Sequence, residues 1–159
     1  IAGNNVTVKG HIDVEGCAIF GDNTRLYRGI NATDFVSFGN YAITCNVLVA
    51  GDVLIENLAV ANKITAGGNV TLGDDVETYD ISSDGEIKVG SCFDGCNIEA
   101  ENDITVDHHA DVGDIWAGGN VTLGEYSRPR NIEARGNIIL GKHVDVRGHI
   151  DIYGKIIEN

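Results

Sequence analysis

The sequence predicts an all-β protein folded as a β-solenoid, a rod of stacked strand turns with a 17-residue repeat and no helices. Three observations predict it. The stretch AGGNVTLG occurs at residues 66–73 and again at 117–124, which is 51 residues or three periods of 17 later. Related segments repeat at the same spacing between and around these copies. The chain has 21 Gly and 1 Pro in 159 residues, which is typical of short strands joined by tight corners.

The first strand of each unit is marked by β-branched residues. Its first position is Ile or Val in eight successive units: Ile19, Val36, Val53, Val70, Ile87, Ile104, Val121 and Ile138. Two residues further on, the side chain is apolar in every unit except at Gly21. Since side chains alternate along a strand, both positions face the interior, and we expect the residue between them to point outward. That places Phe20, Leu54 and Ile139 on the surface.

The second strand of each unit begins eleven residues after the first. Its first position is again always Ile or Val: Ile30, Val47, Ile64, Ile81, Ile98, Ile115 and Ile132. Such a unit buries its apolar face only when units stack about 4.8 Å apart, which gives about eight turns and a rod about 40 Å long. We therefore expect a single domain over residues 1–159. Its regular turns span about 19–148, with atypical terminal turns at 1–18 and 149–159.

The corners are rich in Gly, Asn and Asp. Gly residues flank the first strand, as at Gly68 and Gly73, and we expect positive φ there. The residues that follow the leading Gly predict a side-chain ladder that caps corner amides: Asp52, Asn69, Glu86, Asp103, Asn120 and Asn137. The rest of each unit has one apolar residue at a drifting position, which predicts a looser third side.

Both ends carry near copies of one segment, GHIDVEG at 10–16 and GHIDIYG at 148–154. Neither end offers a capping helix, so we expect open strand edges that template another subunit. His11, Ile12, His149 and Ile150 are the candidate contacts at these edges. Several outward apolar residues suggest additional side-to-side contacts: Leu48, Leu54, Trp116 and Ile139.

Four cysteines, Cys17, Cys45, Cys92 and Cys96, are disulfide candidates. Cys45 and Cys96 share a column three turns apart, about 14 Å, which is too far for a bond. A Cys92–Cys96 loop bond, bonds between molecules and four reduced thiols remain open alternatives.

The chain contains no Met and begins at Ile1, which fits a processed secreted protein as well as a cloning boundary. Four Asn-x-Thr sequons make candidate glycosylation sites: Asn5, Asn31, Asn69 and Asn120.

Charge and motif content disfavour other classes of function. The net charge of −13 disfavours nucleic acid as a partner, and without a run of 18 apolar residues we expect no membrane insertion. The acidic corner at 73–80 is the candidate Ca²⁺ site, although it lacks the regular Asp of calcium-binding repeats, and we expect no cofactor. Adjacent His108 and His109 would point to opposite faces, so we expect solvated side chains and no metal site.

The uninterrupted turns GNVTLG at 68–73 and 119–124 and GDVLIE at 51–56 resemble the polymer-forming bactofilins, which are cytoplasmic β-solenoids. The acidic, cysteine-bearing, Met-free composition is similar to that of the secreted sheath subunits of methanogenic archaea. These resemblances imply a polymer and, for the sheath proteins, amyloid-like hoops stabilised by disulfides.

The sequence therefore predicts a non-enzymatic, extracellular structural protein whose partner is itself. It would self-assemble through strand edges into a filament, sheath or surface layer of the cell envelope. Two alternatives remain: a cytoplasmic bactofilin-like scaffold, and a carbohydrate-binding or carbohydrate-active right-handed β-helix protein. The second requires long loops around a cleft, for which a constant 17-residue spacing leaves no residues.

Overall fold

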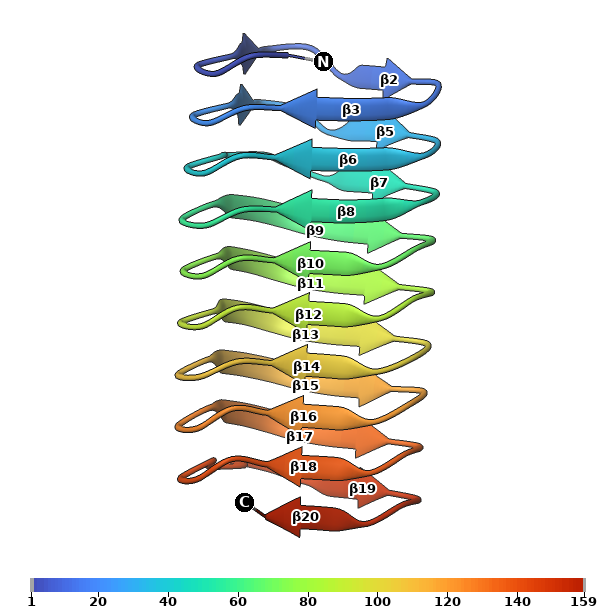
Figure 1. The fold of residues 1–159 in the computed structure, drawn as a ribbon, viewed down its shortest axis with the longest axis vertical. Helices are drawn as coiled ribbons and strands as arrows, with labels where there is room; N and C mark the ends of the chain where they lie inside the picture. The colour runs from blue at the N-terminus through green and yellow to red at the C-terminus, as the bar shows by residue number, and fades with distance from the viewer. Residues whose placement is uncertain (1, 159) are drawn as a thin grey trace.

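Two parallel nine-stranded sheets run the length of the molecule in a computed structural model that describes residues 2–158 (Figure 1). Successive strands of the chain alternate between the sheets, so each strand pairs with the equivalent strand of the next turn. Within the described residues there is no helix, which confirms the predicted all-β solenoid. Nine turns are present rather than eight, because the terminal segments also form strands.

The strands fall into three groups. Sheet 1 contains β3 (Cys17–Phe20), β6 (Phe35–Phe38), β8 (Asp52–Ile55), β10 (Val70–Leu72), β12 (Ile87–Val89), β14 (Ile104–Val106), β16 (Val121–Leu123), β18 (Ile138–Leu140) and β20 (Ile156–Glu158). Sheet 2 contains β2 (Ile12–Val14), β5 (Ile30–Ala32), β7 (Val47–Val49), β9 (Val60–Ala66), β11 (Glu77–Ser83), β13 (Asp94–Ala100), β15 (Asp111–Ala117), β17 (Arg128–Ala134) and β19 (Ile150–Ile152). A short pair is formed by β1 (Thr7–Val8) and β4 (Arg25–Leu26).

The core consists of columns of identical or similar side chains between the two sheets. Val70 and Leu72 of β10 lie in register with Ile87 and Val89 of β12, and all four are buried. From sheet 2, columns of Ile or Val and of small residues face them, as the sequence predicts. Ile64 is fully buried, and Ala66 follows it in the small column.

The first turns depart from the predicted frame. Ile19 is 39% exposed, whereas its neighbours Ala18 and Phe20 are buried, and the ring of Phe20 stacks on Phe38 at 5.0 Å between centroids. The predictions that Ile19 points inward and Phe20 outward are therefore wrong. The reason is an 18-residue turn, since Ala18 pairs with Val36. A second 18-residue turn pairs Ile132 with Ile150, so the interior columns continue to the last turn.

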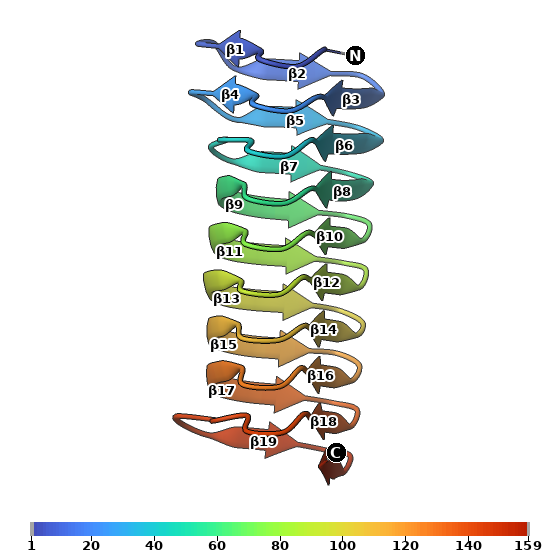
Figure 2. The same cartoon turned by 60° about the vertical axis from the view of Figure 1, so that its left-hand side comes forward.

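The third side is regular rather than loose (Figure 2). It is the face formed by β1, β4, Ile43 and the first residues of β9, β11, β13, β15 and β17, which pair from turn to turn. In these five longer strands, the third side and sheet 2 form one continuous seven-residue strand. Its interior positions are buried, for example Val76 and Phe93, whereas Ile43 and Val60 point outward. The drifting apolar residue of the sequence therefore belongs to different columns in different turns: Val76 and Phe93 lie in one inward column, Val112 in a second inward column, and Ile43 and Val60 in the outward column between them.

Two side-chain ladders hold the corners. The predicted ladder is present at its Asp and Asn members: Asp52 Oδ1 accepts a hydrogen bond from the amide of Asn69 at 2.6 Å, and Asn69 Oδ1 accepts one from the amide of Glu86 at 2.8 Å. The second ladder, at the opposite corner of sheet 1, was not predicted. Each member accepts a hydrogen bond from the amide of the next, and they are Asn4, Asp22, Asn40, Asn57 and Asp74.

The corner glycines leave room for these ladders. A Cβ on Gly68 would lie 2.2 Å from Asp52 Oδ1 and 2.8 Å from the carbonyl carbon of Gly51. A Cβ on Gly73 would lie 2.4 Å from Asn57 Oδ1. Among the glycines of residues 2–158, positive φ occurs at Gly16 and not at these corners, so the expected conformational reason is wrong. Close approach of stacked turns requires glycine here.

Positive φ instead recurs at nine non-glycine residues, one in each turn. Each lies in the corner between sheet 1 and the third side, and they are Asn5, Asn23, Tyr41, Leu58, Asp75, Cys92, His109, Tyr126 and His143. Their φ values lie between 55° and 61°. The repeat therefore imposes one left-handed residue per turn, and the sequence does not mark it with glycine.

The interior columns predict a sharp difference between adjacent residues. Val70→Asp or Ile104→Asp would place a charge at a position with no exposed surface, and we expect a loss of about 4 kcal/mol or more in unfolding free energy. Thr71→Asp and Thr105→Asp lie outside, both in register with Lys88, and should change stability by less than about 0.5 kcal/mol. Circular dichroism during urea unfolding measures both. Equal damage from both pairs would contradict the observed register.

The corner glycines provide a second test. Gly68→Ala should destabilise the protein by about 1–3 kcal/mol, because its Cβ would meet both a ladder oxygen and backbone. Gly10→Ala is the matched control, since nothing lies within 4 Å of its Cβ. It should leave the thermal midpoint unchanged or slightly raised. If Gly68→Ala is as stable as Gly10→Ala, close packing between turns is not what selects glycine.

Candidate assembly surfaces

Both sheets end in strands that have a neighbour on one side only. Sheet 2 begins at β2 and finishes at β19, and sheet 1 finishes at β20 (Figure 1). The near-identical segments at 10–16 and 148–154 therefore supply the two opposite edges of the same sheet. At the last turn the core is open, and the inward-facing Ile150 and Ile156 are 36% and 45% exposed.

The candidate contacts at these edges take different positions. Ile12 and Ile150 continue the same interior column and are in register with Ile30 and Ile132. His11 lies beside Asp13, with 3.3 Å between Nε2 and Oδ1, at the exposed start of β2. The backbone amide of His149 donates to Asn131 Oδ1 at 2.8 Å, a hydrogen bond that links the last turn to the turn before it.

The outward apolar candidates do not form one patch. Leu48 and Trp116 lie on the outer face of sheet 2, four turns apart, whereas Leu54 and Ile139 lie on the outer face of sheet 1, five turns apart. Polar residues fill the column between Leu48 and Trp116, namely Thr65, Ser82 and Glu99. The structure therefore places these candidates outside, as expected, but separately.

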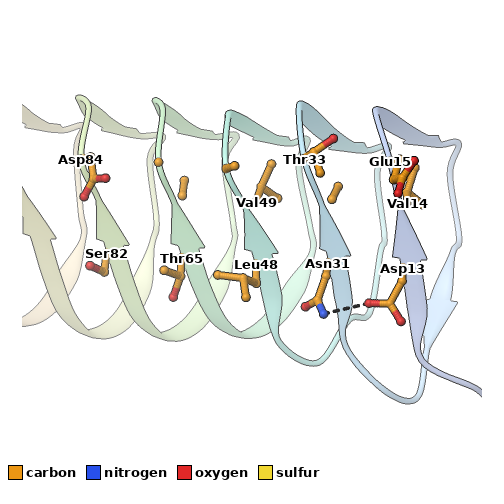
Figure 3. A pocket seen from close by; sticks show the side chains of 14 residues that line it. Asp13, Val14, Glu15, Asn31, Thr33, Leu48, Val49, Thr65, Ser82 and Asp84 are labelled. Carbon is orange, nitrogen blue, oxygen red and sulfur yellow. Dashed lines mark hydrogen bonds between the residues drawn. The ribbon is translucent and has the colours of Figure 1, made fainter.

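Leu48 lies in a shallow hollow on the outer face of sheet 2 (Figure 3). The hollow measures about 940 Å³ and follows the column Asp13, Asn31, Leu48, Thr65 and Ser82. Asn31 Nδ2 donates to Asp13 Oδ1 at 2.9 Å, so its polar end is already internally bonded. With Leu48 51% exposed, this surface combines one exposed large apolar side chain with small hydroxyls and the carboxylates of Asp13, Glu15 and Asp84.

Trp116 makes its contacts within the chain. Its indole Nε1 donates to Glu133 Oε1 at 3.1 Å, one turn further on. The guanidinium of Arg135 lies 5.4 Å from the ring centroid, a cation–π contact that covers part of the indole. Trp116 is consequently only half-exposed, and much of its apolar surface is shielded from a partner.

All four cysteines are free thiols. Cys17, Cys92 and Cys96 are exposed, and Cys45 is half-buried, with its Sγ donating to the carbonyl of Tyr27 at 3.3 Å. Cys92 occupies the left-handed corner position of its turn, and Cys96 lies within β13. Within residues 2–158 no disulfide joins any two of the four cysteines.

The sequons lie at structurally different places. Asn69 and Asn120 are ladder residues whose Oδ1 atoms accept from the amides of Glu86 and Asn137, both at 2.8 Å. Asn31 is bonded to Asp13, and Asn5 has positive φ near the start of the chain. A glycan on Asn69 or Asn120 would compete with the ladder for the same side-chain amide.

The candidate metal positions do not converge. In the part of the chain that the structure describes, no group of three or more His, Cys, Asp or Glu side chains could hold a metal ion. His108 Nε2 lies 3.0 Å from Asp107 Oδ1, whereas the ring of His109 stacks on Tyr126 at 5.1 Å. Tyr126 in turn stacks on His143 at 4.9 Å. Stacking between successive turns brings these three rings together, and their 17-residue spacing in the sequence is the signal that marks them.

A polar cluster strengthens the last regular turns. Arg130 Nε donates to Asp114 Oδ1 at 2.8 Å and Arg130 Nη2 donates to Oδ2, while Asn131 Nδ2 donates to Oδ1 at 2.7 Å. The Arg130 hydrogen bonds hold the pKa of the Asp114 carboxyl below its ordinary value, although partial burial opposes this and Asn131 adds to it. The same bonds raise the pKa of Arg130.

The described residues contain no helix long and apolar enough to span a lipid bilayer. Stacked parallel turns with polar ladders at their corners define a β-solenoid domain. Residues 35–158 match the family model of the Flagellar Assembly Protein A (FapA) beta solenoid domain, and the chain belongs to this family. No curated protein and no solved structure shows significant similarity to it. The match supports the solenoid, whereas the resemblances to bactofilins and to archaeal sheath proteins are not confirmed.

The Asp114 cluster predicts a measurable titration. The pKa of the Asp114 carboxyl is lower in the folded than in the unfolded protein. Its pairing with Arg130 therefore stabilises the fold fully above the unfolded pKa of about 3.9, and this stabilisation is lost as pH falls through the folded pKa. In Arg130→Gln the carboxyl pKa should rise toward about 3.9, as followed by NMR of the side-chain carbon. Arg135→Gln, which removes a cation near Trp116 instead, is the control and should leave Asp114 unchanged. A pKa that stays low in Arg130→Gln would contradict the assignment.

Proposed function

We propose that this domain is a non-enzymatic structural element that associates end to end through its terminal turns. The single observation that carries the proposal is the position of the two near-identical segments at opposite edges of sheet 2. Joining the last turn of one copy to the first turn of the next would set Ile150 and Ile152 of β19 against Ile12 and Val14 of β2. Identical or similar side chains would then stack across the junction, as they do between turns within the rod.

The physical chemistry of the ends favours this contact. Each edge strand has backbone amides and carbonyls on its free side, and each new hydrogen bond contributes on the order of 1 kcal/mol. The open apolar layer at the last turn, which contains Ile150 and Ile156, would also be removed from water. At the first turn, the bridge between Ala2 and Phe20 begins sheet 1 and would meet β20 of the preceding copy.

Two further features agree with a structural role. The regular 17-residue turns from β5 to β18 carry no insertion that would build walls around a reaction site. The family is named for flagellar assembly, and a rod that extends by stacking suits a part in building a larger structure. The same proposal places the protein outside the cell. It also includes disulfides between exposed cysteines of neighbouring copies, which would make the end-to-end contacts permanent.

Two adjacent isoleucines of β20 offer a matched test. Ile156 is 45% exposed and faces the open core, whereas Ile157 is 44% exposed and faces outward. Ile156→Lys should weaken end-to-end association about tenfold or more, since it places a charge in the apolar junction. Ile157→Lys adds the same charge on the outer face of β20 and should change the strength of end-to-end association less than about threefold. Analytical ultracentrifugation and electron microscopy report the assembly.

A cysteine-free variant separates the two contributions to assembly. With Cys17, Cys45, Cys92 and Cys96 all changed to Ser, filaments should still form but should dissociate on dilution or in detergent. The end-pairing mechanism is wrong if this variant is strictly monomeric while Ile156→Lys still polymerises.

A further inference from the structure

An exposed apolar patch lies on the N-terminal half of the third side. It gathers six of the thirteen exposed large hydrophobic side chains within four consecutive turns, and we call it the apolar patch: Tyr27, Tyr41, Ile43, Leu58, Val60 and Tyr79. Their exposed fractions lie between 41% and 64%. None of these residues was identified as an assembly candidate from the sequence, because the third side was expected to be irregular.

The C-terminal half of the same side has the opposite character. The outward column that contains Ile43 and Val60 continues through Glu77, Asp94, Asp111 and Arg128. At the far end of this column the charges are paired on the protein itself: Asp111 binds both Arg128, at 3.1 Å, and Arg147. The repeat thus accepts charged residues at this position, and the apolar pair at Ile43 and Val60 is a local departure that the fold does not require.

Charges of opposite sign border the apolar patch along this column. Its order over four turns is Arg25, Ile43, Val60 and Glu77, that is positive, apolar, apolar and negative. Neither Arg25 nor Glu77 has an ion-pair partner among residues 2–158. Such an order is self-complementary under a two-fold rotation, which exchanges its two halves.

We propose that a second copy of this chain docks on the apolar patch, related by a two-fold axis that passes between Ile43 and Val60. This arrangement sets Ile43 against Val60 of the second copy and Arg25 against Glu77 of the second copy. Each ion pair then occurs twice, at both borders of an apolar centre, which is the usual layout of a protein interface. A hollow of about 290 Å³ beside Val60 and Tyr79 gives room for a side chain of the second copy.

The size of the apolar patch sets the strength expected. Four turns and about five residues of strand width cover about 300 Å² of flat surface per copy, below the roughly 800 Å² per partner of a stable complex. We therefore expect a weak dimer, populated at concentrations on the order of 100 μM. In an end-to-end assembly the same contact would recur along the rod and gain strength by multivalency.

A charge exchange tests the two-fold arrangement. In an Ile156→Lys background, which suppresses end pairing, Arg25→Glu should weaken dimerisation about tenfold or more, because it creates two like-charge contacts with Glu77 of the second copy. Adding Glu77→Arg reverses both charges and should restore dimerisation to within about threefold. Lys88→Glu, an equal charge change on the outer face of sheet 1, is the control and should have no effect. Sedimentation equilibrium measures all four, and circular dichroism checks the fold.

Several outcomes would overturn the proposal. It fails if the Ile156→Lys protein is monomeric at several hundred micromolar, since no dimer then exists without end contacts. It also fails if the double exchange does not recover dimerisation, or if Lys88→Glu weakens it as much as Arg25→Glu. Measuring the unmodified chain in parallel shows whether end pairing itself occurs, so failure of either mechanism is recognised separately.

Discussion

Parallel in-register stacking of equivalent turns is the constraint on which the rest of this structure depends. A residue finds its neighbours along the rod one turn away, at the same place in the repeat. Every turn must therefore follow the same backbone path at the spacing of a β-sheet. The interior columns of Ile, Val and Ala, the ladders of Asn and Asp, and the left-handed residue in each turn are consequences of this one requirement. The ladder and the glycine beside it are coupled, because the oxygen of Asn69 occupies the space that a Cβ on Gly85 would need.

The same constraint determines where function can reside. Interior and ladder positions serve the stack, so residue types vary most at outward positions, at the left-handed corner and at the two ends. Outward columns hold threonine, lysine, glutamate, isoleucine and tryptophan without harm to the repeat. A surface built this way has shallow hollows such as the one around Leu48, and its recognition chemistry is that of flat faces. The proposed assembly contacts accordingly use flat faces and the two ends.

End contacts and side contacts differ in their physics. An end contact extends backbone hydrogen bonding and closes the open layer around Ile156, so it depends little on outward side chains. A side contact on the third side relies on Ile43, Val60 and the flanking charges, and it is sensitive to single substitutions. The two surfaces lie at right angles on the rod, so one copy can use both at once. Membership of the FapA β-solenoid family agrees with such a structural part, and the exposed thiols of Cys17, Cys92 and Cys96 lie outside the core.

The amino-acid sequence by itself determined the all-β class, the 17-residue period, the interior columns from Val36 to Ile138 and the ladder that begins at Asp52. It could do so because a repeated side-chain environment leaves a repeated residue type. Only the tertiary structure decided that Ala18 and Phe20, not Ile19, face inward, since an 18-residue turn shifts the frame and leaves only Gly21 as a departure in the apolar row. It also decided that close approach between turns, rather than positive φ, explains the corner glycines, and that residues as different as Leu58 and Cys92 share the left-handed position. The ordered third side and its apolar patch were likewise decided by the tertiary structure. Contacts between turns depend on the path of the backbone, and the residue types indicate that path only at buried positions.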